Sequence, residues 1–396
     1  MRKFHHQNHI LESSCFGILL VLLTLLHPLS VNATRETEYS PILLGQSCAL
    51  SGPARDLGTE LRSGLLASFA YINDRGGIKG REVHLISLDD GYEPDKAVRN
   101  TYRLITEDDA FLLIGQVGTP TSKAVIPIIE KFKIPFFAPF TGADLLRTPF
   151  RKYVINIRAS YFQEMEKIAS YLIDQQNLTR ISCFYQNDSY GFAGLTGIEQ
   201  ALARRNMTLV SKGSYERNTL AVMGSIKDIY KAAPQAVVLV GAYTACAEFI
   251  KLSKTRVGQN ITFCNISFVG TESLKEALGT YGNNVIASQV VPDPHETSIP
   301  LIKEYTRSMK LYQHDAPLSF TSLEGYLSGK LFAAIALAVP GKLTREAFIS
   351  TMQSKGTFDL GGIVLQFGPR DHQGLDTIHL TTIYPAIQSL KTEEGK

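Results

Sequence analysis

The chain has 396 residues, 44% of them hydrophobic, and a formal net charge of +3 at pH 7. This length and apolar content are sufficient for a large core and for two domains. The near-neutral charge and the lack of a basic run give no support for binding to nucleic acid or to an anionic membrane surface. Trp is absent, so aromatic contacts with a ligand would have to come from Tyr or Phe.

Residues 1–33 have the pattern of a signal peptide. Arg2 and Lys3 precede the apolar run Phe16–Leu26, and small residues end at Ala33. Pro28 interrupts the apolar run before it reaches the roughly 20 residues that a membrane span needs. We therefore expect cleavage near Ala33 and a mature protein in the periplasm, outside the cytoplasm.

Four cysteines remain after this cleavage, namely Cys48, Cys183, Cys246 and Cys264. They either form a disulfide or stay as free thiols. An oxidising compartment permits a disulfide, and the pair Cys246–Cys264 is favoured because both residues lie in the second half. The other alternative is buried free thiols. The chain has no CxxC or Cys/His spacing typical of a metal site, so we expect neither a metal nor a cofactor.

From residue 41 onward, short apolar runs alternate with amphipathic stretches. Strands are expected at 42–45, 83–88, 111–114 and 134–138, then at 153–157, 180–185, 207–210, 236–240, 267–270 and 285–291. Helices are expected at 59–74 and 95–107, from Thr119, and at 161–175, 191–204, 220–232 and 245–255. This alternation predicts an α/β protein with two doubly wound parallel sheets. Later helices at 298–312, 319–338 and 344–354 have no strands of their own and are expected to cover the first sheet, before strands at 363–367 and 377–382.

The stretch Leu112–Lys123 carries the first indication of a site. An apolar strand ends in Gly115 and Gly118, and hydroxyl residues open a helix at the positions Thr119, Thr121 and Ser122. Such a junction directs backbone N–H groups and hydroxyls toward a place where an anion such as a carboxylate can bind. Junctions of this kind are also common in α/β proteins of any function. Similar small and hydroxyl residues follow two other strands, at Ser51-Gly52 and Thr141-Gly142, and one shared site is expected.

The motifs in chain order resemble those of a known family. They are Gly45–Pro53, Ile72–Gly80, Leu88–Asp90, Gly115–Ser122, Pro135–Pro139, Asn187–Gly191, Gly270–Glu272 and Glu324–Tyr326. The chain resembles the Leu/Ile/Val-binding type of periplasmic substrate-binding protein of ABC importers, over nearly its whole mature length. The resemblance implies two lobes, residues 40–157 plus 292–360 and residues 158–291 plus 361–390, joined by three crossovers near 156–160, 288–292 and 361–364. The lobes would close over a ligand by a hinge motion.

The resemblance also implies a ligand-binding site for an amino-acid-like molecule. Its carboxylate would bind Thr119 and Thr141-Gly142, its ammonium would bind Glu272, and Tyr190 and Tyr243 would close the second lobe on it. Plainer roles remain open: helix caps for the threonines, packing between the lobes for the tyrosines, and an ordinary acid near a helix start for Glu272. Arg158 and Tyr161 lie at the first crossover, where they either contact the ligand or lock the hinge; we favour the hinge.

Departures from the family pattern leave the ligand open. Gly118-Thr119-Pro120 replaces a serine-rich turn, which alters one hydroxyl and removes one backbone N–H. Leu57 stands where the family has a pocket tyrosine, and the first-lobe disulfide of the family is missing because Gly118 replaces one half. The ligand is therefore expected to be an amino acid, an amide, urea or a small carboxylate.

Two functions are consistent with these residues and with the family resemblance. The first is delivery of the ligand to a membrane ABC permease, and the second is a ligand-sensing module that docks on a membrane receptor. The chain has no G-x-S-x-G, H-E-x-x-H, Walker A or dinucleotide-binding motif at a strand–helix junction, and His295, His314 and His372 are isolated in loops. An enzyme is not expected.

Overall fold

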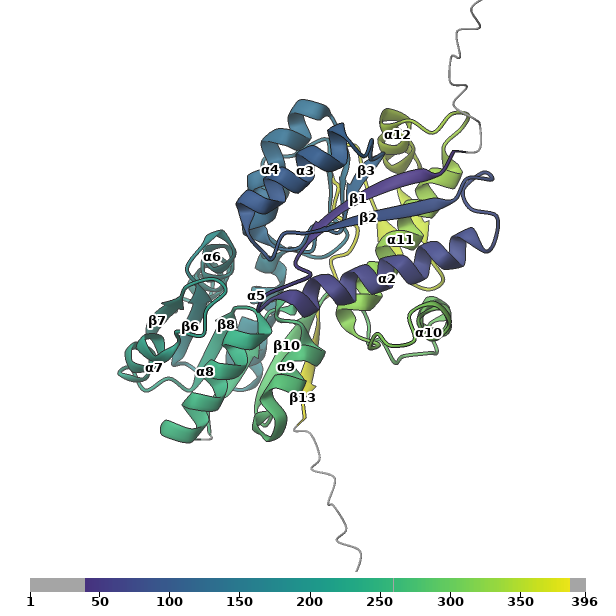
Figure 1. The fold of residues 1–396 in the computed structure, drawn as a ribbon. Coiled ribbons are helices and arrows are strands. Elements are labelled where there is room, and N and C mark those ends of the chain that lie inside the picture. Colours follow the sequence, from purple (N-terminus) through teal and green to yellow (C-terminus); the bar gives the residue numbers. More distant parts are fainter. Residues whose placement is uncertain (1–39, 259, 385–396) are drawn as a thin grey trace, which may run out of the picture. The chain divides into compact units, whose positions relative to one another are not determined.

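The computed structural model describes residues 40–258 and 260–384 (Figure 1). The expected signal peptide and residues 385–390 of the expected second lobe lie outside the described residues. Within the described ranges, the helices and strands alternate as an α/β protein with two large, mainly parallel sheets. The fold class expected from the sequence is confirmed.

The first sheet of the described chain has five parallel strands in the order β2-β1-β3-β4-β5. They are β1 (Ile42–Cys48), β2 (Val83–Asp89), β3 (Leu112–Ile114), β4 (Phe136–Phe137) and β5 (Val154–Ile155). The order reverses between β1 and β3. In doubly wound sheets, ligands bind in the crevice at such a switch point, outside the carboxyl ends of the strands.

Helices cover both faces of this sheet. The helices α3 (Pro94–Thr106) and α4 (Thr119–Phe132) pack on one face. The other face is covered by α2 (Arg55–Asn73), α10 (Pro300–Tyr312), α11 (Phe320–Ala338) and α12 (Arg345–Lys355). In Figure 1, α2 runs beside α11 and α10, which come from the far end of the sequence. The late helices therefore complete the first core, as their lack of partner strands predicted.

The second sheet of the described chain has the order β13-β10-β9-β8-β6-β7, and only β13 runs antiparallel. Its strands are β6 (Ile181–Gln186), β7 (Ser211–Tyr215), β8 (Ala236–Val240), β9 (Thr262–Asn265), β10 (Val285–Gln289) and β13 (His379–Ile383). The accompanying helices are α5 (Tyr161–Ala169), α6 (Ser189–Ala203), α7 (Met223–Tyr230), α8 (Tyr243–Arg256) and α9 (Thr271–Leu278). Short helical turns occur at η1 (Asp144–Leu146), η2 (Ser170–Gln175, a π-helix), η3 (Ser267–Val269) and η4 (Gly279–Tyr281).

Two expected strands are wrong. Residues 207–210 are irregular, and the strand β7 follows them with the polar sequence SKGSY. Residues 267–270 are not a strand either, because β9 ends at Asn265 and the apolar residues after it form the turn η3. In both places the apolar residues are buried without pairing to a neighbouring strand. Their hydrophobicity alone therefore predicted a strand where none forms.

The expected crossovers can be compared with the backbone pairing. The N–H of Asn156 donates to His372 O at 2.8 Å, and the N–H of Leu375 donates to Ile157 O at 2.8 Å. The first crossover therefore lies beside residues 372–375. The hairpin of β11 (Thr357–Asp359) and β12 (Val364–Gln366) packs in the first core through Phe358 and Leu365. Residues after 360, where the first lobe was expected to end, therefore still pack in the first core, Phe367 among them.

The four cysteines of the described chain are buried free thiols. The Cys246–Cys264 disulfide that the sequence permitted is not formed. Burial raises the pKa of the Cys264 thiol to about 12, which keeps it protonated and unreactive at neutral pH. No helix within residues 40–258 and 260–384 is both long and apolar enough to span a membrane.

Candidate functional site

The carboxyl ends of the two sheets face each other, and loops from both sides are in contact. Ser273 Oγ of α9 donates to Glu60 Oε1 of α2 at 3.0 Å. Gln186 Nε2, at the end of β6, donates to the hydroxyl of Tyr92 at 3.4 Å. The first and second lobes are therefore in contact in this structure at the ends of their strands.

Three hydroxyl groups meet at the ends of β3 and β4, and we call them the hydroxyl cluster: Thr119, Thr141 and Tyr161. The Oγ1 atoms of Thr119 and Thr141 lie 2.6 Å apart, and Thr141 Oγ1 donates to the Tyr161 hydroxyl at 3.1 Å. All three side chains are buried. Burial raises the pKa of Tyr161 to about 12, so its proton stays in place at neutral pH. The cluster is a set of neutral donors that can turn toward an anion.

Glycines hold the backbone of this cluster close to aromatic rings. Gly118, at the N-cap of α4, has φ +96°, and a Cβ there would approach Tyr92 Cε2 to 2.1 Å. A Cβ on Gly142 would lie 2.6 Å from Tyr161 Cδ1. Pro120 occupies the first turn of α4, where its missing N–H breaks no helical hydrogen bond. Gly118 and Gly142 are thus required by the close approach of Tyr92 and Tyr161.

Thr121 and Ser122, also predicted as ligand residues, differ from Thr119. Thr121 Oγ1 donates to the carbonyls of Val117 and Gly118, the latter at 3.0 Å, and so serves its own helical turn. Ser122 Oγ is buried and has no hydrogen-bond partner among the described residues. The hydroxyl of Thr121 is thus bonded within its own helix, whereas that of Ser122 is unbonded among the described residues.

The two predicted tyrosines of the second lobe lie in different surroundings. Asp188 caps α6 and accepts the N–H of Tyr190 at 2.9 Å, which fixes the start of that helix. The Tyr190 ring then lies 5.6 Å from that of Tyr161, next to the hydroxyl cluster. Tyr243 lies at the start of α8, where burial and then the charge of Asp56 raise its pKa. Tyr190 therefore contacts the cluster, while Tyr243 interacts with α2.

Glu272 lies in the first turn of α9, and its Oε2 atom is buried without a partner among the described residues. Burial, and next the charge of Glu60, raise its pKa to about 8. Glu60 itself accepts hydrogen bonds from Ser319 at 2.6 Å and Ser273 at 3.0 Å, and burial raises its pKa to about 6. In the described structure Glu272 is thus grouped with Glu60 rather than with Thr119 and Thr141.

Arg158, predicted for the hinge, is completely enclosed, with 1% of its surface exposed. Its Nη2 donates to Ser267 Oγ at 2.6 Å, its Nε lies 3.3 Å from Glu324 Oε1, and its guanidinium stacks on Phe140 at 4.3 Å. Glu164 completes this network by accepting from the Ser267 N–H at 2.8 Å. Arg158 therefore links the first crossover to residues of both lobes.

Sequence reasoning missed several residues that shape this region. Tyr92, Phe140 and Phe268 bring aromatic rings to the ends of the strands. Arg147 joins two crossovers, because its Nε donates to Gln373 Oε1 at 2.6 Å and its Nη2 to Arg158 O at 2.8 Å. An apolar residue just after a strand, such as Phe140 after β4, was a usable signal for a ring. Nothing in the local sequence marked the positions of Phe268 or Arg147. Among the described residues, no group of three or more His, Cys, Asp or Glu side chains is arranged to hold a metal ion.

Two α/β lobes that close on buried hydroxyl and aromatic groups define a two-lobed ligand-binding protein. Comparison with known proteins agrees: a family model described as "Periplasmic binding protein" matches residues 41–385, and the chain belongs to this family. The members are binding proteins rather than enzymes, and the family implies an extracytoplasmic location.

Relatives of known name support this assignment. The chain is 25% identical over 325 residues to "Leu/Ile/Val-binding protein homolog 7" of Brucella abortus (strain 2308), with 79% of this chain and 81% of that protein covered. A crystal structure of a possible leucine/isoleucine/valine-binding protein from Rhodopirellula baltica SH 1 superposes with a TM-score of 0.84 at 36% identity, covering 88% and 95% of the two chains. A leucine-binding protein from Thermotoga maritima MSB8 shares the fold, with a TM-score of 0.78 at 15% identity over 87% and 96%.

Proposed function

We propose that this protein is an extracytoplasmic solute-binding protein that encloses a small amino-acid-like ligand between its lobes and presents it to a membrane ABC importer. The observation that carries the proposal is the hydroxyl cluster of Thr119, Thr141 and Tyr161. It is buried at the switch point of the first sheet and faces Tyr190 of the second lobe. The relatives named for binding leucine, isoleucine and valine support the same ligand class.

The side chains of the proposed site include groups suited to both charges of a zwitterion. The hydroxyl cluster and the N-terminus of α4 would accept a carboxylate, since N–H groups and the helix dipole favour negative charge there. Glu272, whose Oε2 has no partner among the described residues and whose pKa is raised to about 8, would receive the ammonium group after losing its proton, and Ser122 and Gly142 would add polar contacts. Tyr190 and Tyr243 would close on the ligand from the second lobe, and Arg158 and Arg147 would guide the hinge.

The lobes proposed for this motion differ slightly from the expected ones. We assign residues 41–157 and 292–367 to the first lobe, because β11 and β12 pack in its core. The second lobe comprises residues 158–291 and the strand β13, which pairs with β10. The segment 372–375 would then act with the first crossover as part of the hinge.

The ligand is tested by calorimetry on protein freed of bound solute by unfolding and refolding. We expect one or more of the twenty amino acids, or a small amide or carboxylate, to bind the wild type. Thr141→Ala should weaken binding roughly 10–100-fold, because a hydrogen bond to a charged group contributes about 1.5–3 kcal/mol. Thr106→Ala is the matched control, since its hydroxyl bonds only to Tyr102 O on the exposed side of α3. Failure of every compound to bind, or equal affinity in Thr141→Ala and wild type, would refute the proposed site.

The importer is tested separately. A permease–ATPase complex from the same organism, reconstituted in lipid nanodiscs, should hydrolyse ATP faster when this protein is added together with its ligand. Ligand-loaded protein that leaves every such complex unstimulated but binds a membrane receptor would contradict delivery to an importer.

A further inference from the structure

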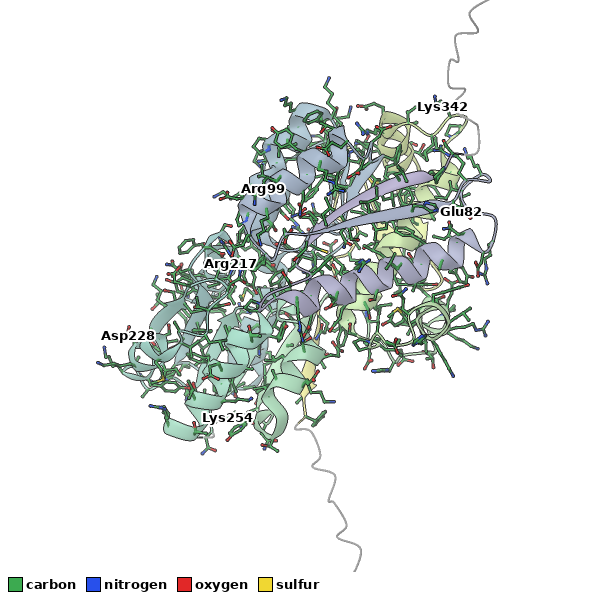
Figure 2. All side chains as sticks on the ribbon, in the orientation of Figure 1. Glu82, Arg99, Arg217, Asp228, Lys254 and Lys342 are labelled. Carbon is green, nitrogen blue, oxygen red and sulfur yellow. The ribbon has the colours of Figure 1, made fainter. Side chains whose placement is uncertain are left out.

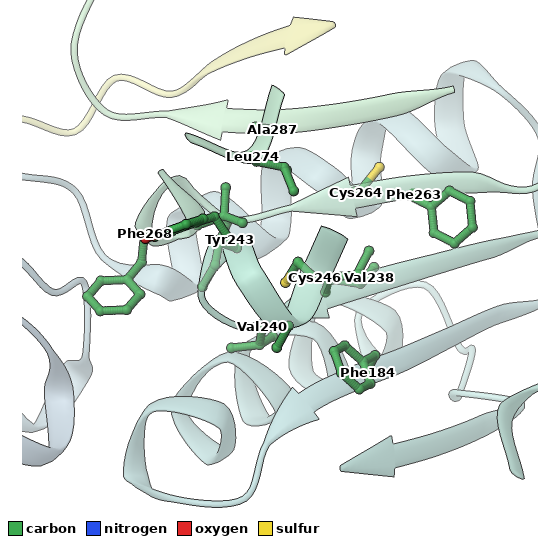
Figure 3. Packing of buried hydrophobic residues seen from close by; sticks show 14 of the residues in the cluster. Phe184, Val238, Val240, Tyr243, Cys246, Phe263, Cys264, Phe268, Leu274 and Ala287 are labelled. Carbon is green, nitrogen blue, oxygen red and sulfur yellow. The ribbon is translucent and has the colours of Figure 1, made fainter. Parts of the chain in front are cut away.

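Phe268 of the second lobe reaches across the site to the first lobe. It lies in η3 (Ser267–Val269), between β9 and α9, and it is fully buried. Figure 3 shows its ring apart from the other labelled side chains of the second core, directed away from the sheet. The ring belongs to the core cluster of the second lobe and extends from it to rings of the first lobe.

Three rings surround Phe268, and two of them belong to the first lobe. Its centroid lies 4.5 Å from that of Tyr190, 5.6 Å from that of Phe140 and 5.9 Å from that of Tyr92. All four side chains are at most 1% exposed. We call Tyr92, Phe140, Tyr190 and Phe268 the aromatic group.

Each partner ring of Phe268 is adjacent to a residue of the proposed carboxylate site. Phe140 directly precedes Thr141 in the chain. Tyr92 packs against Gly118, which precedes Thr119. Tyr190 packs on Tyr161. A ligand whose carboxylate is held by the hydroxyl cluster would therefore meet Tyr190 from the second lobe and, beside it, the Phe268 ring that packs on Tyr190.

We propose that Phe268 is the residue that determines ligand specificity, by limiting the ligand to a short side chain of the size of glycine, alanine or serine. This inference rests on the proposed function and specifies its substrate class. The rings of the aromatic group already occupy one another's surfaces, and well-packed interiors accept added methylene groups only with strain. Each methylene that a pocket excludes or accepts changes affinity by roughly 10–200-fold.

The test measures dissociation constants for glycine, alanine, valine and leucine by calorimetry in wild type and Phe268→Ala. We expect the wild type to bind alanine at least ~10-fold more tightly than leucine, and Phe268→Ala to shift this ratio at least ~10-fold toward leucine. Phe268→Leu, closer in volume, should give a smaller shift and covers the case that the alanine variant does not fold. Phe192→Ala is the matched control, because Phe192 is 48% exposed on α6 and contacts Tyr185 instead.

Three results would overturn the inference. A wild type that prefers leucine to alanine contradicts the size limit. Equal weakening of all ligands in both Phe268 variants would mean that the ring only holds the lobes together. If the wild type binds amino acids and shows neither a preference for leucine nor equal weakening in the variants, the size limit stands. A wild type that binds none of the tested compounds refutes the proposed function and this inference with it.

Discussion

Arg158 shows how a single side chain connects the two lobes. Its charge is enclosed together with those of Glu324 and Glu164, and Glu324 is itself only 4% exposed. Removing one partner of a buried ion pair leaves the other charge without compensation, which costs far more than the loss of a surface pair. The loss of one charge from this network is therefore expected to lower the free energy of unfolding of the whole protein.

We predict that Arg158→Met lowers the free energy of unfolding by about 3–5 kcal/mol, because Glu324 is left buried and unpaired. Urea unfolding followed by circular dichroism measures the loss. A second substitution, Glu324→Gln, should restore part of it. Arg204→Met is the control: Arg204 pairs with Glu166 at the surface, so its loss should be about 1 kcal/mol or less. An equal decrease in the free energy of unfolding in Arg158→Met and Arg204→Met would show that the buried pair contributes no more to stability than the surface pair.

At the residue level, the sequence predicted that Thr119 and Thr141 lie close together, whereas their contact with a ligand stays a prediction. Thr119 and Thr141 follow apolar runs and carry hydroxyls, and the structure joins them at 2.6 Å. The position of Phe268 could not be predicted, since its ring packs on Tyr190 of its own lobe and also reaches rings of the other lobe. Burial between lobes and burial within a sheet look the same in a sequence, so contacts across the cleft need the three-dimensional fold.

At the scale of elements, strands that are buried on both faces were located well. The expected strand at 236–240 is the observed β8, all of whose residues are buried. The edge strand β7 was missed because its sequence is polar and it pairs only with β6. Partly buried Met207 and Leu209, just before it, pack against the core as loop residues and gave the misleading signal.

The segment after β7 also forms a contact between the lobes. Arg217, labelled in Figure 2, lies 2.9 Å from Glu93 of the first lobe and 3.1 Å from Asp188 of its own lobe. Asn218 Nδ2 donates to Glu93 Oε1 at 2.7 Å. These groups would separate when the lobes open, so they stabilise the closed state specifically.

We predict that Arg217→Ala speeds dissociation of the ligand and weakens its binding about 1.5–5-fold, because one partly exposed pair between the lobes, that with Glu93, is lost and such a pair contributes about 0.2–1 kcal/mol. Stopped-flow fluorescence measures the dissociation rate. Arg205→Ala is the matched control, because Arg205 is similarly enclosed but pairs with Asp174 and Glu166 inside the second lobe. If both variants release ligand at the same rate, the Arg217 contact is not part of closure.

On the scale of the whole molecule, closure brings carboxyl groups of the two lobes together. Glu60 belongs to α2 of the first lobe and Glu272 to α9 of the second, and Asp293 adds further negative charge. Burial, then the neighbouring charge, raises the pKa of Glu272 from 4.5 to about 8, and burial raises that of Glu60 from 4.5 to about 6. The closed state therefore holds protons that the open or unfolded chain releases between about pH 4.5 and pH 8.

Because the folded form binds more protons in this range, its stability must fall as the pH rises. We predict that the melting temperature of the ligand-free protein decreases by at least about 2 °C from pH 6 to pH 9, and that small-angle scattering shows a larger radius of gyration at pH 9. Glu272→Gln should remove most of this dependence, whereas Glu276→Gln, on the exposed side of the same helix, should keep it. A melting temperature that stays constant or rises with pH would contradict this prediction. It would show that Glu272 is already ionised in the closed protein and can attract an ammonium group without first losing a proton.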